Sequence, residues 1–205
     1  MTDHFDDRAA TWDQDQDTVD RARTVADGIA ARVPLSTDHR VLEYGAGTAL
    51  VAQMLQDRVG PLTLVDRSAG MREVMQRKIE AGDLPTDARV LSVDLATEPA
   101  PEGPFDVIIT SMVLHHILEL DRVLTAFHDL LTPGGWVCIA DLDEEDGSFH
   151  QHVHDFHGHN GFNRDTLTAD LGKAGFTDVT FGDAGTVDKE GATFGVFLAT
   201  ARRAG

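Results

Sequence analysis

Residues 41–47, Val-Leu-Glu-Tyr-Gly-Ala-Gly, constrain the fold of this chain more than any other segment. Four largely apolar residues predict a buried β-strand, and the glycines that follow predict a tight turn into a helix beginning at Thr48. Gly45 and Gly47 tolerate a positive φ and allow a ligand to approach the backbone, so the segment indicates a cradle for a cofactor. The Glu43 carboxylate would repel the pyrophosphate of NAD or FAD, but it suits a cofactor with an ammonium group.

Strand-like and helix-like periodicities alternate along the chain. This alternation predicts an α/β fold, a doubly wound and mostly parallel sheet with helices on both faces. The expected strands are residues 41–44, 62–65, 89–93, 107–110, 136–140, 176–181 and 194–200, and the expected helices lie near 49–58, 71–81, 122–131 and 164–174. The last two strands are expected to pair antiparallel, and Pro133-Gly134-Gly135 is expected to form a turn before the fifth strand.

The length of 205 residues and the apolar content of 41% fit one domain. Within it we expect an N-terminal lid and helix (1–35), a cofactor-binding core (36–140), a substrate-facing loop (141–163), and a C-terminal helix with a strand pair (164–205). No apolar run is long enough for a membrane span, and no signal peptide is recognised at the N-terminus. The lone Cys138 is expected in the core, and the chain is expected in the cytoplasm.

The chain is strongly acidic, with 17 basic and 35 acidic residues and a net charge of −18. Such a surface repels phosphate backbones and anionic membranes, so we expect neither nucleic acid nor a membrane as a partner. A small neutral or cationic molecule is the favoured ligand. Much of the charge is expected simply to keep the exterior solvated.

These features resemble the class I S-adenosylmethionine-dependent methyltransferases, specifically the small bacterial-type enzymes that act on small molecules. The first motif of the family, an acidic residue followed by alternating glycines, is matched by Glu43, Gly45 and Gly47, with Ala49 at the third glycine position. Alanine there is expected to be a mild departure, since that position mainly allows close helix packing. The resemblance runs from about Phe5 to the C-terminus. It implies a Rossmann-like, seven-stranded sheet with a reversed final strand, S-adenosyl-L-methionine as cofactor and S-adenosyl-L-homocysteine as product.

The ends of the strands supply the residues expected to bind this cofactor. Asp66 would accept hydrogen bonds from the ribose hydroxyls. The resemblance places Asp94 on the adenine amino group and Leu95 against the adenine ring. The remaining candidates for the cofactor site are Ala46, Arg67, Met71, Ser111, and Trp12 as a lid residue.

The acceptor pocket is expected to contain Trp12, His115 and the segment 141–159, in which five of the ten histidines fall between residues 150 and 159. The adjacent His115 and His116 are not expected to face the same way, and His115 is favoured to border the pocket, with a structural role in the loop as the alternative. Three alternatives remain for the segment: a substrate-facing loop with a histidine base, a metal site, or a polar surface loop. The candidate bases are His115, His154 and His157. No metal is predicted, because the histidines lack a standard ligand spacing.

The predicted reaction is direct displacement of the cofactor's methyl group by a small-molecule acceptor, at an oxygen, nitrogen, sulfur or carbon atom. Two alternatives stay open. One is a module that binds S-adenosylmethionine without turnover. The other is an NAD-dependent oxidoreductase, which Glu43 and the lack of a Tyr-x-x-x-Lys pair disfavour, since Tyr44 is the only tyrosine. Monomer and dimer are equally open.

Overall fold

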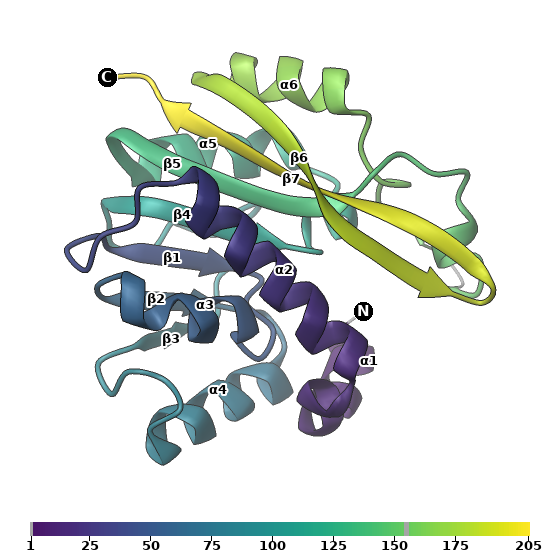
Figure 1. Ribbon diagram of the computed structural model, residues 1–205, viewed down its shortest axis with the longest axis horizontal. Helices are drawn as coiled ribbons and strands as arrows, with labels where there is room; N and C mark the ends of the chain where they lie inside the picture. The colour runs from purple at the N-terminus through teal and green to yellow at the C-terminus, as the bar shows by residue number, and fades with distance from the viewer. Residues whose placement is uncertain (1, 154–155) are drawn as a thin grey trace.

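The computed structural model describes residues 2–153 and 156–205, and within them one seven-stranded sheet has the order β3-β2-β1-β4-β5-β7-β6 (Figure 1). Strands β1 to β5 run parallel, whereas β7 pairs antiparallel with both β5 and β6. The strands are β1 (Val41–Tyr44), β2 (Leu62–Val65), β3 (Arg89–Leu91), β4 (Phe105–Ser111), β5 (Leu131–Leu142), β6 (Phe176–Lys189) and β7 (Ala192–Arg203). The predicted doubly wound sheet with antiparallel final strands is confirmed.

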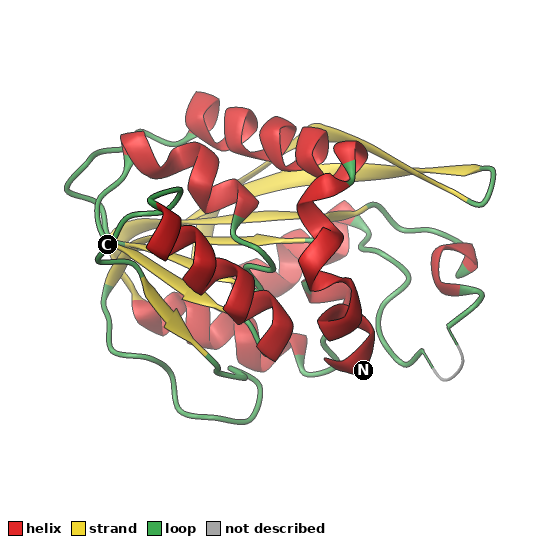
Figure 2. Cartoon of the chain, turned by 90° about the horizontal axis from the view of Figure 1, so that it is seen from below, coloured by secondary structure: helices red, strands yellow, loops and turns green. Residues whose placement is uncertain are grey.

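Helices lie on both sides of the strands (Figure 2). The α-helices are α1 (Thr2–Arg8), α2 (Gln16–Arg32), α3 (Leu50–Leu55), α4 (Ala69–Ala81), α5 (Leu120–Leu130) and α6 (Arg164–Lys173), and the 3-10 turns are η1 (Ala9–Gln14), η2 (Gln56–Arg58), η3 (Leu114–His116) and η4 (Ser148–His150). Helices α2, α3 and α4 share a buried apolar cluster with one face of the sheet, and α5 and α6 share a second cluster with the other face.

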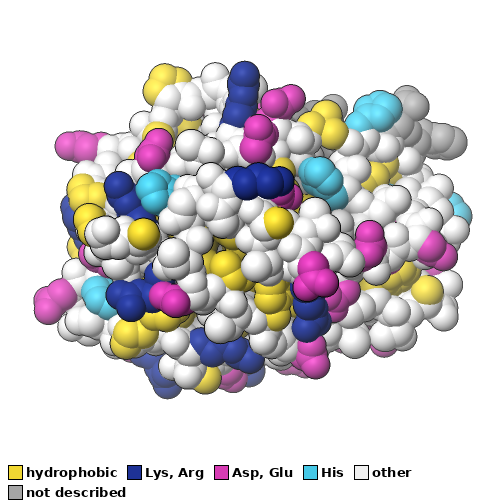
Figure 3. Space-filling view, turned by 90° about the horizontal axis from the view of Figure 1, so that it is seen from above, with side chains coloured by type: hydrophobic (Ala, Val, Ile, Leu, Met, Phe, Trp, Pro, Cys, Tyr) yellow, Lys and Arg dark blue, Asp and Glu magenta, His cyan; other side chains and the backbone are white. Residues whose placement is uncertain are grey.

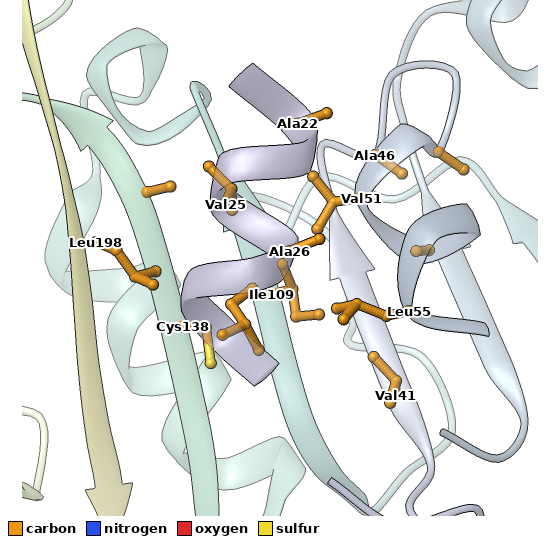
Figure 4. Packing of buried hydrophobic residues seen from close by; sticks show 14 of the residues in the cluster. Ala22, Val25, Ala26, Val41, Ala46, Val51, Leu55, Ile109, Cys138 and Leu198 are labelled. Carbon is orange, nitrogen blue, oxygen red and sulfur yellow. The ribbon is translucent and has the colours of Figure 1, made fainter. Parts of the chain in front are cut away.

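Helix α2 illustrates how the first face is closed. Val25 and Ile29 are fully buried on it, one turn apart, so that the apolar stripe of the helix faces the strands. Figure 4 shows this helix lying over Ile109 and Cys138 of the central strands. Cys138 is a free thiol in the core, as predicted, and burial raises its pKa to about 12.

Some element boundaries differ from the sequence predictions. Strand β5 begins at Leu131 and includes Pro133-Gly134-Gly135, because Leu131 already pairs with Phe105 across an irregular register. It also continues through Leu142, so the predicted loop begins two residues after position 141. The hairpin of β6 and β7 is longer than expected, and its far end meets the segment after β5: Lys189 Nζ donates to the Phe149 carbonyl at 2.5 Å.

The N-terminal segment docks beside the carboxyl ends of β1 and β2. The Asp6 carboxylate accepts from Ser68 Oγ at 2.5 Å and from Gly70 N at 2.9 Å. Asp13 forms an ion pair with Lys78 at 2.7 Å and accepts from Thr48 Oγ1 at 2.5 Å. These contacts hold α1 and η1 against the start of α4 and the glycine turn.

Among the described residues, none of the helices combines the length and apolarity that crossing a bilayer requires. On the face shown in Figure 3, basic side chains are interspersed with acidic ones. The mixture there agrees with an acidic exterior that is solvated rather than built to hold a polyanion.

Candidate functional site

The glycine turn after β1 has the open backbone that the sequence predicts. Gly45 and Gly47 both have positive φ, 68° and 56°. A Cβ at Gly45 would overlap the side chain of Val113, so this position is closed to any other residue. A Cβ at Gly47 would meet nothing within 4 Å, so space remains beside that backbone for a ligand. Ala46, between them, is buried and donates its N–H to the Val65 carbonyl at 2.9 Å.

Ala49 departs from the prediction. The expected helix start at Thr48 is wrong, because α3 begins at Leu50 and Ala49 is its N-cap in the left-handed conformation, with φ 63°. This region disfavours a Cβ by about 1–2 kcal/mol, so glycine is favoured here for its backbone freedom as well as its small size. The alanine is therefore a strained substitution rather than a mild one.

Glu43 lies buried in β1, below the glycine turn. Its Oε2 accepts from Ala52 N at 3.0 Å, at the start of α3. Burial raises the pKa of Glu43 to about 8, against weaker opposing effects of the Ala52 hydrogen bond and the Lys78 charge. A cationic ligand at the turn would favour the ionised form of this carboxyl.

Asp66 follows β2 and faces the same turn. Its Oδ2 accepts from Gly47 N at 2.7 Å, and its Oδ1 accepts from Ser68 N at 2.8 Å. Burial raises the pKa of Asp66, and these two hydrogen bonds oppose that shift. Each carboxylate oxygen retains acceptor capacity, so Asp66 can still receive hydrogen bonds from a pair of hydroxyls.

The residues after β3 lie next along the sheet. Asp94 pairs with Arg67 at 2.8 Å and caps its own loop through Ala96 N at 3.0 Å. Leu95 is buried, and its N–H donates to Tyr44 Oη at 3.3 Å. Strand register thus brings the candidates for the nucleoside end, Asp66, Asp94 and Leu95, to adjacent strand ends.

Three further candidates occupy varied positions. Met71 is buried in α4, whereas Ser111 is the half-buried last residue of β4. Trp12 is half-buried in η1, 6.1 Å from the Phe5 ring, with the Arg8 guanidinium 5.1 Å over it. Their proposed contacts with a cofactor stay predictions.

A buried histidine–carboxylate pair stands where β4 and β5 end. His115 Nδ1 lies 2.5 Å from Asp141 Oδ1, and both side chains are at most 2% exposed. Asp141 also accepts from Leu142 N at 2.8 Å and from His115 N at 3.3 Å. An acceptor-only carboxylate at this nitrogen fixes the tautomer with hydrogen on Nδ1, which leaves the Nε2 lone pair free.

His116 and His150 join His115 in one cluster, which the sequence analysis did not predict. The His116 ring lies 4.1 Å from that of His115, and the His150 ring lies 5.3 Å from both. The expectation that the two adjacent histidines cannot face the same way is wrong, because the tight 3-10 turn of η3 brings both rings of the pair together. Burial, with smaller effects of the neighbouring imidazoles, lowers the pKa of His116 to about 3. Burial likewise lowers the pKa of His150 to about 4.

The other candidate bases are not part of this cluster in the described structure. His157 is exposed, and His154 lies outside the described residues, so their roles stay predictions. His159 is half-buried, with its Nε2 at 2.9 Å from the Ile117 carbonyl. The clue that could have found His150 is the density of histidines after β5, but only the path of the chain selects it from the others.

A family model described as a methyltransferase domain matches residues 18–180 of this chain. The chain belongs to the methyltransferase domain family. A methyltransferase of Mycobacterium bovis is 32% identical over 110 residues, which cover 54% of this chain and 53% of that protein. A methyltransferase of Schizosaccharomyces pombe is 31% identical over 120 residues, covering 56% of this chain and 42% of that protein. The matches thus span about half the length of these relatives.

Solved structures show the same fold at low sequence identity. Phosphoethanolamine N-methyltransferase 2 of Haemonchus contortus, in complex with S-adenosyl-L-methionine, aligns with a TM-score of 0.74 at 16% identity, covering 88% of this chain and 52% of that one. The methyltransferase in complex with the Trm112 activator of Haloferax volcanii gives 0.75 at 18% identity, covering 98% of both chains. The [4+2]-cyclase SpnF gives 0.71 at 18% identity, covering 87% and 79%. This chain therefore has the class I methyltransferase fold. The fold alone does not determine which reaction the chain catalyses.

The residues at the glycine turn fit S-adenosylmethionine. The space beside Gly47 admits a ligand, the buried Glu43 carboxyl suits an ammonium, and Asp66 offers acceptors for two hydroxyls. The predicted cofactor is thereby consistent with this chain's own geometry as well as with its family.

Proposed function

We propose that this chain transfers a methyl group from S-adenosylmethionine to a small-molecule acceptor. The observation that carries the proposal is the position of the buried His115–Asp141 pair. His115 follows β4 and Asp141 lies near the end of β5, and Val113, two residues before His115, packs on Gly45 of the glycine turn. A group able to take a proton therefore lies beside the region expected to hold the cofactor.

One side of the site would bind the cofactor, and the other would position the acceptor and take its proton. Glu43 and the backbone of the turn would hold the methionine part of the cofactor, and Asp66 and Asp94 the nucleoside. When bound, S-adenosylmethionine supplies a methyl group already activated by the sulfonium charge. The protein's own contribution is then alignment of the acceptor and removal of a proton where the acceptor carries one.

His115 is the residue best placed for the proton. Asp141 keeps hydrogen on Nδ1, so Nε2 can accept a proton from an acceptor hydroxyl, amine or thiol, and the carboxylate stabilises the resulting imidazolium. The aromatic rings of Phe149 and Phe156 lie close to the cluster, which favours a small acceptor over a macromolecular one. The net charge of −18 favours a neutral or cationic acceptor.

Two measurements test this function in sequence. Calorimetry should show S-adenosylhomocysteine binding at micromolar affinity or tighter, about 8 kcal/mol or more. A screen of small amines, phenols and thiols should then yield at least one acceptor that generates S-adenosylhomocysteine faster than a protein-free control. Binding without turnover across the screen would favour the non-catalytic module, and lack of binding by the folded chain would reject the function altogether.

A further inference from the structure

The strongest unexplained feature of the molecule is the histidine cluster, defined as His115, His116 and His150. Each residue offers one ligand nitrogen, and the three nitrogens lie within 4.8 Å of one another. They come from η3 and η4, which are separated by more than 30 residues of chain. Proton removal needs one imidazole, so the other two have no part in the proposed function.

Two nitrogens of the histidine cluster are buried without a partner. Nδ1 of His116 and Nδ1 of His150 make no hydrogen bond within the described part of the chain. A buried polar atom left unsatisfied costs about 1–3 kcal/mol, and native proteins tolerate few of them. Two such atoms in one cluster point to a ligand that takes nitrogen lone pairs.

The third histidine is prepared for a ligand in a different way. Asp141 receives the Nδ1 hydrogen of His115 at 2.5 Å and is itself held by Leu142 N. Metal-binding histidines commonly donate their other ring N–H to a carboxylate in this manner, which orients the ring and raises its basicity. The arrangement leaves His115 Nε2 as the metal-binding nitrogen.

The surroundings suit a metal held by neutral imidazoles. The His150 ring stacks on Phe156 at 3.7 Å, and the Phe5 and Phe149 rings meet His116 and His115 edge-on at 5.8 and 6.1 Å. The apolar rings restrict water around the ligands, while His116 is only half-buried and offers an entry path.

Two charged side chains act on the cluster in opposite directions. The Asp141 carboxylate favours a cation, whereas the Lys189 ammonium opposes one and also lowers the pKa of His116 and His150. Lys189 is, however, engaged elsewhere: it donates to the Phe149 carbonyl and lies 4.3 Å from the Phe149 ring centroid. Its charge is therefore partly compensated outside the cluster.

We propose that His115, His116 and His150 bind one divalent transition-metal ion of the zinc and cobalt class, with Asp141 orienting His115. Three imidazoles select such ions over magnesium or calcium, which prefer oxygen ligands. Nitrogens about 2.1 Å from a tetrahedral ion are about 3.4 Å apart, so nitrogens that lie within 4.8 Å of one another would need to approach by at most about 1.4 Å to bind one ion. This proposal replaces the sequence prediction of no metal.

Three protein ligands leave a fourth coordination position, as in catalytic zinc sites. Resting on the proposed function, we place an acceptor oxygen, nitrogen or sulfur at that position. A bound metal would lower the pKa of a coordinated hydroxyl or thiol, whose proton would leave to water, so the acceptor would be presented as a nucleophile. In that metal-bound state His115 would serve as a ligand, whereas in the metal-free protein its Nε2 is the base. The metal site itself does not depend on methyl transfer.

Binding is tested with tag-free full-length protein, because an affinity tag would itself supply histidines. Titration with Zn2+ by calorimetry should give one site per chain, and Co2+ should give visible d–d absorption typical of four-coordinate nitrogen ligation. His150→Ala should weaken Zn2+ binding at least 100-fold and abolish the Co2+ band. The matched control is His157→Ala, an exposed histidine of the same segment, and it should bind as the wild type does.

Asp141→Asn tests the orienting contact and should weaken Zn2+ binding by about 10–100-fold while leaving the ligands intact. Metal-free thermal melting and S-adenosylhomocysteine binding serve as fold controls; His116→Asn is the second ligand variant if His150→Ala does not fold. Equal Zn2+ affinity in the wild type and in the folded ligand variant would overturn the site, as would a stoichiometry well below one. Retained S-adenosylhomocysteine binding in that case would leave the proposed function standing.

Discussion

The candidate site has two halves that differ in chemistry: the cofactor half at the ends of β1 and β2, and the histidine half at the ends of β4 and β5. At the ends of β1 and β2, backbone N–H groups of Gly47, Ser68 and Ala52 hold carboxylates in a turn whose glycines leave room for a ligand. At the ends of β4 and β5, imidazole rings from two distant segments lie against one another, and Asp141 hydrogen-bonds His115 alone among them.

The two halves also differ in how far apart in the sequence their residues lie. The cofactor half joins residues 43–68, with Asp94 nearby, so a short motif specifies it. The histidine half needs the turn after β4, the strand end of β5 and the turn η4, and the aromatic Phe5 also meets it. A ligand that is common to a fold can be bound by a local motif, whereas a ligand particular to one chain is bound by long-range packing.

The largest expected effect tests whether the Glu43 carboxyl of the cofactor half is protonated in the folded protein. The pKa of Glu43 is raised from 4.5 to about 8 in the folded protein, so its stabilising contribution is complete below pH 4.5 and is lost as the pH rises through about 8. Relative to Glu43→Gln, the free energy of unfolding of the wild type should therefore fall by about 1.4 kcal/mol per pH unit across that window. Urea denaturation at several pH values measures it.

The control for this comparison is Glu80→Gln, an exposed glutamate on α4, which should keep the pH dependence of the wild type. If Glu43→Gln also followed the wild-type curve, Glu43 would be ionised in the folded protein. The cofactor half would then lack a buried neutral acid.

The next largest effect distinguishes the role of the histidine half in turnover from the role of the cofactor half in cofactor binding. His115→Ala should reduce methyl-transfer turnover by about 100-fold, yet leave S-adenosylhomocysteine affinity within about twofold, because the histidine serves the acceptor only. His115→Asn keeps a donor for Asp141 and controls for the cost of an unpaired buried carboxylate. His157→Ala tests the other candidate base among the described residues and is expected to lose less turnover; a loss equal to that of His115→Ala would move the acceptor site toward the exposed loop.

A smaller effect is expected at Asp66. Asp66→Ala removes the acceptors for the ribose hydroxyls and should weaken S-adenosylhomocysteine binding by about 1–3 kcal/mol, as measured by calorimetry. Asp57→Ala, at an exposed position of η2, is the control and should bind normally. Unchanged affinity in Asp66→Ala would mean that Asp66 serves only to hold Gly47 and Ser68.

Much of the cofactor half could be predicted from the sequence because residues close together in the chain form it. A strand, a glycine turn and an acidic residue at the next strand end define the positions of Glu43, Gly47 and Asp66 once the sheet is parallel. The conformation of Ala49 could not be predicted in this way, since motif spacing does not reveal a backbone dihedral. The partnership of His116 and His150 was also missed, because it depends on how two 3-10 turns pack.

The smallest effect concerns that dihedral. Ala49→Gly relieves a left-handed alanine, worth about 1–2 kcal/mol, but adds about 0.5–1 kcal/mol of chain entropy to the unfolded state. The net gain should be at most about 1.5 kcal/mol in the free energy of unfolding. Ala52→Gly, three residues later and equally buried within α3, should instead destabilise the chain by about 1 kcal/mol or more. The same sign for both changes would remove the case for strain at Ala49.

The long hairpin of β6 and β7 has a kinetic consequence for the histidine half. Its end contacts the segment that carries His150 at three points: Lys189 bonds the Phe149 carbonyl, and Glu190 meets Gln151 at 2.9 Å and His152 at 2.7 Å. Displacing that segment requires these contacts to break or the hairpin end to move with it (Figure 1). The rate at which a ligand enters or leaves the histidine cluster should therefore depend on fraying of the β6–β7 hairpin, some 40 residues further along the chain. Slow amide hydrogen exchange at the hairpin end would then accompany slow exchange of the ligand.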